Sequence, residues 1–384
     1  MSTRIINLLP VIFLLVLSMF PIHSIPPVIS NSLFLERSQL SINYLSLYTA
    51  IYYVGFFIVG VFFIFSKFKV SASVRTITVS TIIWALSYYF SLNHLSEEWL
   101  IACRAILGGA CFLLYAQCFM LIFVSFNGLA AYSSLFAIGT MFLDSFAFLN
   151  GASIEFLPYS IATYVFSFLP FFLVTYVLIY VNFFLKNEST IGLSLDFHGV
   201  IKEMRTTMPS ILINVAFFLF LYMLPLLNIP TITSFHIGMC ILSLSVAFPL
   251  GAKLSHSVYN KLGMINSLKV YTLIALIGIC FFSTALEIHT SITLILGAMF
   301  MAFGNAGILV INTFDASKEK VIDNAKPQVA YMLATSLVTI ILINIMKIFD
   351  SSNQSITLVM GGIYIFLILI FLTRKTIEVK LTSY

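Results

Sequence analysis

The sequence predicts an all-α membrane protein that crosses the bilayer twelve times and keeps both termini in the cytoplasm. Of the 384 residues, 60% are hydrophobic and only 9% are charged, whereas roughly a quarter of the residues in a soluble domain are charged. The hydrophobic residues form successive runs of about 20 residues, the length of helix that crosses the hydrocarbon core. Short polar loops separate these runs, and their basic residues gather on one side of the predicted membrane.

Basic residues indicate which side of the membrane each loop occupies. If the runs alternate across a bilayer, sixteen of the nineteen Lys and Arg residues fall on one side. Cytoplasmic loops carry an excess of Lys and Arg near span ends, so this side is predicted to be the inside. Three residues depart from the pattern: Arg37 in an outer loop, Arg104 inside a span, and Lys347 at the outer end of a span, where it is expected to snorkel to the interface. The net charge of +5 is scattered singly through loops, so no nucleic-acid partner is expected.

The first hydrophobic run is kept as a helix, although Arg4 and the run after it resemble a signal peptide. The run ends in Pro21 to Pro27 and contains no small-residue cleavage site. Removing it would also leave an odd number of spans. The predicted spans cover residues 5–28, 42–65, 76–94, 98–125, 130–150, 158–185, 208–227, 232–254, 269–286, 291–314, 327–348 and 356–373.

A polar stretch near the middle of the sequence divides the chain into six spans plus six. It predicts an N-terminal bundle over residues 1–185, a cytoplasmic connector over 186–207, and a C-terminal bundle with a short tail over 208–384. Its KEMR segment, residues 202–205, is predicted to be a surface helix. Internal repeats of this kind are common among secondary transporters.

The cysteines are interpreted as small apolar packing residues. All of them fall inside predicted spans, and no pair has the spacing of metal ligands or lies in a loop that could carry a disulfide. No metal site and no cofactor are expected. The five positions are Cys103, Cys111, Cys118, Cys240 and Cys280.

Several segments resemble the major facilitator superfamily of transporters. A proline-rich end of the first span, Pro26 and Pro27, precedes a second span with small residues at Gly55 and Gly60. The loop after the second span is a degraded form of the family's gate motif. Ser66 stands where the family has the acidic residue of an Asp-Arg pair, and the second glycine is missing, although basic residues remain at Lys67, Lys69 and Arg75.

The equivalent gate loop of the second half matches the gate motif better than the loop of the first half. It carries Gly251, Lys253, Lys261, Gly263 and Lys269. The fourth span resembles a family motif in which an arginine is followed by one or two glycines, and the tenth span resembles the counterpart of that motif in the second half. The fourth span has Arg104, Gly108 and Gly109, and the tenth has Gly297, Gly304 and Gly307. The glycine-proline pair that drug/proton antiporters carry on the fifth helix is absent.

The resemblance implies two pseudo-symmetric six-helix bundles that rock around a central site. Two charged residues within the spans are candidates for that site. Arg104 and Asp144 lie at similar depth on sequential antiparallel spans, and a lone charge in the membrane is costly. We expect the two to interact directly or through water, with Asp144 as the carboxylate that gains and loses a proton. A permanent ion pair that only fixes helix packing is the alternative.

Two histidines in the outer parts of spans, His23 and His236, are further candidates for proton sensing, although a lone histidine in an apolar stretch is often a structural residue. Polar residues on the spans that would line a central cavity are candidates for solute contact, or for hydrogen bonds between helices. These are Tyr48, Tyr52, Tyr115, Gln117, Asn214, Tyr222, Asn305, Asn312 and Tyr331.

The predicted function is secondary active transport of a small organic solute across the cytoplasmic (inner) membrane by a monomer. Proton coupling is expected, and compact size with short loops favours efflux over uptake. The chain has no glycine-rich nucleotide-binding loop of an ATP-driven pump and no zinc-protease or nucleophile-elbow motif, so it is not expected to be an enzyme. The alternatives are a non-transporting receptor or scaffold with a transporter fold, and a membrane enzyme of glycan assembly, which would need a large basic outer loop.

Overall fold

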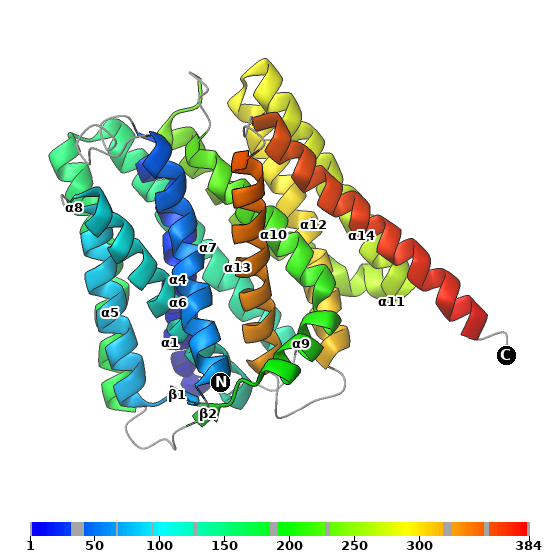
Figure 1. The fold of residues 1–384 in the computed structure, drawn as a ribbon, viewed down its shortest axis with the longest axis horizontal. Helices are drawn as coiled ribbons and strands as arrows, with labels where there is room; N and C mark the ends of the chain where they lie inside the picture. The colour runs from blue at the N-terminus through cyan, green and yellow to red at the C-terminus, as the bar shows by residue number, and fades with distance from the viewer. Residues whose placement is uncertain are drawn as a thin grey trace.

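The computed structural model describes residues 2–31, 42–66, 68–93, 96–125, 129–184, 191–226, 231–317, 325–348 and 353–381. Helices account for nearly all of these residues, and long helices stand together as one bundle (Figure 1). The all-α class expected from the sequence is therefore correct, apart from one small pair of strands. Lys67 lies outside the described residues, as do the side chains of Arg4 and Lys347.

The first half of the chain contributes six long helices, drawn in blue to green-cyan in Figure 1. A four-residue helix, α2 (Pro26–Ile29), continues the direction of the chain after the first of them. The six are α1 (Ser2–Ser24), α4 (Ile42–Phe65), α5 (Val74–Leu92), α6 (Glu97–Ser125), α7 (Leu129–Phe156) and α8 (Tyr159–Phe184).

The second half follows a short connector that contains the helix α9 (Phe197–Thr206). The segment predicted as a surface helix lies in α9, where Lys202 and Arg205 are exposed. The helices of the second half are α10 (Met208–Met223) with the 3-10 turn η1 (Leu224–Leu226), α11 (Ser234–Ile288), α12 (Ser291–Ser317), α13 (Ala325–Ile348) and α14 (Asn353–Leu381).

Among the described residues, nine helices are long and apolar enough to cross a membrane. They include α11, whose 55 residues lie on both sides of a break at Gly263 and exceed what one crossing of a hydrocarbon core roughly 30 Å thick requires. Large apolar side chains are widely exposed on the outside of the bundle, for example Phe172, Phe183 and Leu358. A soluble protein rarely exposes so much contiguous apolar surface. The chain is therefore an integral membrane protein with multiple spans.

Helix α5 is not among the nine, because its serines, threonines and tyrosines lower its mean hydropathy, yet its pattern suits a bilayer. Its apolar residues at Val79, Ile82 and Leu86 are exposed, and its serines and threonines face the bundle. The buried Thr81 and Ser87 hydroxyls donate to carbonyl oxygens one turn earlier, at 2.8 and 2.6 Å. Hydroxyl groups satisfied within their own helix can be buried in a membrane protein without other partners.

Helix α11 covers two predicted spans and the loop between them. The sequence predicted spans 232–254 and 269–286 joined by a gate loop, and the structure has two helices that meet at a break within this region. At the break, Gly263 has φ 72° and ψ 173°, a backbone conformation that favours glycine. Gly251 and Lys261, predicted in the loop, lie on the helix before the break, Gly251 buried and Lys261 exposed. After the break, Cys280 is exposed, in contrast to the four other cysteines, which are buried as expected.

Two helices of the first half approach each other backbone to backbone. A Cβ atom on Gly55 of α4 would lie 1.9 Å from the carbonyl oxygen of Ala105, and one on Gly108 of α6 would lie 2.0 Å from that of Tyr52. Small residues allow such contact in a membrane, where apolar burial gives helices little driving force. The close approach brings Arg104 of α6 against the aromatic rings of α4.

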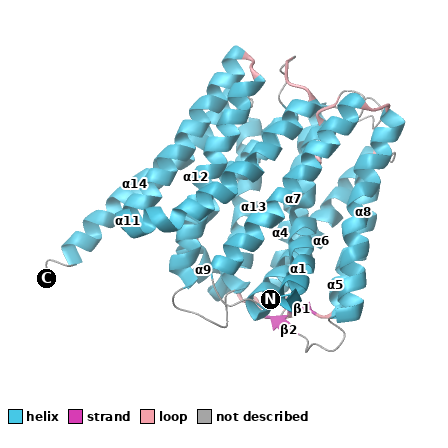
Figure 2. Cartoon of the chain, turned by 180° about the vertical axis from the view of Figure 1, so that it is seen from behind, coloured by secondary structure: helices cyan, strands magenta, loops and turns pink. Residues whose placement is uncertain are grey.

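The two strands join the loop after α4 to the connector. Strand β1 (Val70–Ala72) pairs antiparallel with β2 (Ile191–Leu193), with Ser71 opposite Gly192. Farther along the connector, Asp196 caps α9 by accepting a hydrogen bond from the Gly199 N–H at 2.6 Å, and it also forms an ion pair with Lys326 at the start of α13. We call the end of the bundle with β1, β2 and α9 the sheet end, and the opposite end the far end (Figure 2).

Candidate functional site

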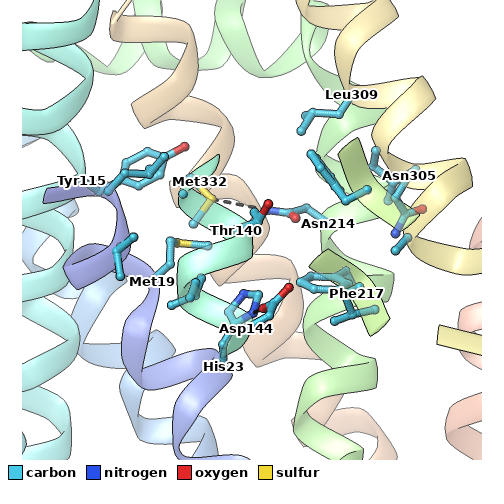
Figure 3. A pocket seen from close by; sticks show the side chains of 18 of the residues that line it. Met19, His23, Tyr115, Thr140, Asp144, Asn214, Phe217, Asn305, Leu309 and Met332 are labelled. Atoms are coloured by element: carbon cyan, nitrogen blue, oxygen red, sulfur yellow. Dashed lines mark hydrogen bonds and ion pairs between the residues drawn. The ribbon is translucent and has the colours of Figure 1, made fainter. Parts of the chain in front are cut away.

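A cavity lies between the two halves of the chain. It is lined from the first half by α1, α6 and α7, and from the second half by α10, α11, α12 and α13. Its volume is about 60 Å³. Apolar side chains such as Met19, Phe217 and Leu309 form most of the wall, with a few polar groups among them (Figure 3).

A histidine and an aspartate lie side by side at one edge of this cavity (Figure 3). His23 Nδ1, near the end of α1, lies 2.7 Å from Asp144 Oδ1 in the middle of α7. The two side chains are only 4% and 1% exposed. The His23 ring also packs against Phe217 of α10, with ring centroids 5.6 Å apart, so the pair touches the second half of the chain. A buried charge needs a partner of this kind, because water cannot solvate it there.

The expected contact between Arg104 and Asp144 is not present, because each residue has a different partner. Arg104 is 2% exposed, and its Nη2 donates to the carbonyl oxygen of Pro21 at 3.1 Å. Its guanidinium also lies over the Tyr48 and Tyr52 rings, 5.3 and 5.1 Å from their centroids. Similar depth on neighbouring helices therefore did not imply contact.

Prolines end α1 beside the His23–Asp144 pair. Pro26 and Pro27 have no N–H, so they leave the carbonyl groups of Ile22 and His23 without their usual helical donors. A neighbouring carbonyl, that of Ser24, accepts a hydrogen bond from Asn150 Nδ2 of α7 at 3.0 Å. The sequence therefore folds α1 so that its last turn is held by α7, which fixes His23 next to Asp144.

The cavity is closed at the far end by contacts between the halves. Ser30 Oγ, just after α2, lies 3.3 Å from Ser234 Oγ at the start of α11. In the same region α7 packs tightly on α11, and a Cβ atom on Gly151 would lie 2.5 Å from the Ser234 carbonyl oxygen. The described structure is therefore a conformation in which the far end is shut.

Four of the nine predicted cavity residues line the cavity: Tyr115, Asn214, Asn305 and Tyr331. Asn305 accepts a hydrogen bond from the Tyr364 hydroxyl at 2.7 Å, and its Nδ2 is buried without a partner among the described residues. Asn214 Nδ2 donates only to the sulfur of Met332, at 3.4 Å, and a thioether is a weak acceptor. Both amides are thus available to a polar solute.

The other predicted cavity residues lie elsewhere. Tyr52 and Tyr222 line a second, smaller hollow beside Arg104, and Tyr48 lies against the Arg104 guanidinium. Gln117 Nε2 donates to the Ser71 carbonyl of β1 at 3.2 Å. Asn312 Nδ2 donates to Ser210 Oγ at 2.7 Å, which joins α12 to α10.

The remaining predicted residues serve local structure in this conformation. His236 Nδ1 lies 3.0 Å from Thr233 Oγ1 and accepts from the Thr233 N–H at 3.3 Å, so it caps the start of α11. Lys69 and Arg75 are exposed on either side of β1. None of the three lines the cavity between the halves.

Sequence reasoning missed the apolar and hydroxyl residues of the wall, such as Met19, Thr140, Phe217 and Met332. Nothing in the sequence distinguishes them, because every span is rich in such residues and the rotation of a helix about its axis cannot be read from hydropathy alone. The one available signal was the proline break, which marks α1 as irregular beside His23.

Comparison with known proteins finds similarity in structure only. No family model matches the sequence, and no curated protein matches it. Two crystal structures of the nucleoside transporter NupG resemble the fold over its whole length. A mutant of NupG gives a TM-score of 0.64 at 12% identity and covers 96% of this chain and 99% of its own. The second gives 0.63 at 11% identity, with coverage of 97% and 99%. The chain therefore shares the overall fold of these two structures.

Proposed function

We propose that this protein is a secondary transporter that moves a small polar organic solute across the cytoplasmic membrane by alternating access. The observation that carries the proposal is the cavity between the two halves, with the buried His23–Asp144 pair at its edge. A cavity shared by two bundles can open to either side if the bundles rock around it. The shut far end is one of the two positions that such a cycle requires.

The proposed topology has twelve spans with both termini in the cytoplasm. Counting α11 as two spans, divided at Gly263, and adding α5 and α14 to the eight other apolar helices gives twelve. The sheet end would face the cytoplasm, because Lys69, Arg75 and Lys202 are exposed there and the excess of basic residues marks the inside. The cavity as described would then be shut toward the outside.

Proton coupling is proposed to occur at the His23–Asp144 pair. When both ring nitrogens of His23 are protonated, the pair is an imidazolium beside a carboxylate and carries no net charge. When only one ring nitrogen is protonated, the imidazole is neutral and the pair carries the charge of the Asp144 carboxylate alone. The neutral form is the cheaper one to bury, so protonation favours the shut arrangement and loss of a proton favours access to water. Histidine suits this role because its unperturbed pKa lies near physiological pH.

The proposed solute is uncharged, ring-containing and rich in hydrogen-bonding groups. Asn214 and Asn305 offer amide groups, and Phe217 and Tyr115 offer aromatic faces against which a ring can pack. Nucleosides have this chemistry and are the first class to test, since NupG is a nucleoside transporter. The direction we propose is export, on the grounds of compact size and short loops.

The test is solute flux in proteoliposomes that contain the purified protein. A panel of labelled nucleosides and other neutral solutes is followed with and without a pH gradient, from loaded and from empty vesicles, which determines direction. We expect saturable flux that the gradient accelerates. Asp144→Asn and His23→Gln should abolish the acceleration, whereas His236→Gln, a matched change at a helix cap, should retain it.

Each failure has a distinct meaning. Saturable solute binding without flux would identify a receptor with a transporter fold instead of a transporter. Flux that responds to the gradient equally in the wild type and in Asp144→Asn would remove the His23–Asp144 pair from coupling while leaving transport intact.

A further inference from the structure

A second hollow lies beside Arg104, apart from the cavity described above. Its volume is about 10 Å³, a small fraction of the 60 Å³ of the cavity between the halves. Its walls come from both halves of the chain. Ile22 and Pro26 stand at the break after α1, Tyr52 and Tyr53 belong to α4, and Tyr222 belongs to α10.

The positive charge of Arg104 is not balanced within the described part of the chain. Its Nη2 hydrogen bond goes to a neutral carbonyl, and its Nε and Nη1 are buried with no hydrogen-bond partner. Among the described residues, no carboxylate lies within ion-pair distance of the guanidinium. Asp144, the nearest candidate by depth, is paired with His23. An uncompensated buried charge in a membrane is expensive, and it usually marks a functional site.

The tyrosine rings compensate the charge only in part. The faces of Tyr48 and Tyr52 attract the guanidinium, but cation–π contacts of this kind offset less free energy than burial of an unpaired charge costs. Tyr53 lines the same hollow, and its hydroxyl forms no hydrogen bond with another described residue. The Nε and Nη1 groups of Arg104 and the hydroxyl of Tyr53, which have no hydrogen-bond acceptor among the described residues, therefore border the same small hollow.

We propose that this hollow binds a single monatomic anion of the chloride class, held by the Arg104 guanidinium and the Tyr53 hydroxyl. The ligand must be an anion because the groups that face it are a cation and donors. A monatomic anion suits this hollow because the hollow is much smaller than the cavity between the halves. This site is separate from the proposed solute cavity, and its test does not depend on transport.

The anion would stabilise the described arrangement of the two halves. Residues of α1, α4 and α6 meet Leu221 and Tyr222 of α10 around the hollow, so an ion there lies between the halves. A ligand shifts a conformational equilibrium toward the state that binds it more tightly. Chloride is therefore expected to favour the form in which the far end is shut.

The experiment measures the Tm of the purified full-length protein in sodium chloride against sodium gluconate at equal ionic strength. We expect a saturable rise in Tm with one midpoint, since a ligand that binds only the native state stabilises it by mass action. Bromide should reproduce the effect and sulfate should not. Tyr53→Phe should raise the midpoint several-fold, Arg104→Gln should abolish the rise, and Arg75→Gln, a change at an exposed arginine, should leave it unaltered.

A second measurement keeps the proposal testable if Arg104→Gln does not fold. Crystals of the wild-type protein grown in bromide should show an anomalous peak within hydrogen-bonding distance of the guanidinium. A chloride response that persists in Arg104→Gln would place the anion elsewhere and overturn the proposal. No saturable response together with no anomalous peak would mean that the hollow holds only water, which would overturn it too.

Discussion

Replacing Gly151 with alanine should open the far end of the protein. The added Cβ would lie 2.5 Å from the carbonyl oxygen of Ser234 and 3.3 Å from Cα of Gly238, whereas ordinary contact begins at 3.4 Å. Helices α7 and α11 must then separate by 3.4 − 2.5 = 0.9 Å at this point. Both opposing atoms belong to backbone, so no side chain can turn aside to make room.

The expected size of the effect follows from the cost of overpacking. Inserting a methyl group into a tightly packed contact costs about 1–3 kcal/mol. Because the clash exists only while the two helices are together, the cost falls on the shut form alone. A factor of ten corresponds to about 1.4 kcal/mol, so the open form should gain about 5-fold to about 140-fold in population.

A cysteine at Ser234 reports the opening, because this residue is only 4% exposed and its Oγ lies 3.3 Å from Ser30 Oγ at the closed contact. In a background with Cys280→Ser, which removes the exposed native cysteine, Ser234→Cys is labelled in membranes by a soluble thiol reagent. Gly362→Ala is the matched control, since nothing lies within 4 Å of the Cβ it would add. If Gly151→Ala folds and is labelled within twofold of the control, the far-end contact does not limit opening.

Three further changes test other parts of the structure. Asp196→Asn keeps the α9 cap but removes the charge paired with Lys326. The hydrogen bond from Lys326 lowers the pKa of Asp196, so its stabilisation is present at neutral pH and lost as the pH falls through that lowered value. A Tm difference from wild type worth less than about 1 kcal/mol should therefore shrink in acid, and one that grows would contradict this reasoning. Gly263→Ala should lower Tm by a backbone cost of about 1–3 kcal/mol, and an unchanged Tm would mean that the break in α11 is not strained. Tyr364→Phe leaves the acceptor of Asn305 unsatisfied and should cost about 1–3 kcal/mol by thermal unfolding, unless water replaces the hydroxyl and the Tm stays constant.

The sequence predicted the helices well because burial in lipid imposes long apolar runs. The predicted range 42–65 coincides with α4, and the range 98–125 differs from α6 by one residue. The segment predicted as the gate loop of the second half is helical on both sides of Gly263, because polar residues such as Lys253 and Lys261 extend from a helix into solvent as readily as from a loop. Only the glycine at the break marked a turn of the backbone.

The site was harder to predict than the helices. Hydropathy gives the depth of a residue in the membrane but not the direction in which its side chain leaves the helix. Asp144, Arg104 and His23 have similar depths, and the sequence alone favoured the two formal charges as partners. The structure turns Asp144 toward α1 and Arg104 toward the tyrosines of α4. The break at Pro26 then decides which carbonyls of α1 are free to accept.

The start of the connector is held at two points. The first is the pairing of β2 with β1, which ends at Leu193, and the second is the ion pair between Asp196 and Lys326. Three residues of extended chain span at most about 11 Å, so the strand pair and Lys326 cannot move farther apart than this unless the pairing or the ion pair breaks. The exposed ion pair between Asp196 and Lys326 is weaker than the strand pairing and should break first. The length of this segment therefore sets how far the two halves can separate at the sheet end while both contacts remain.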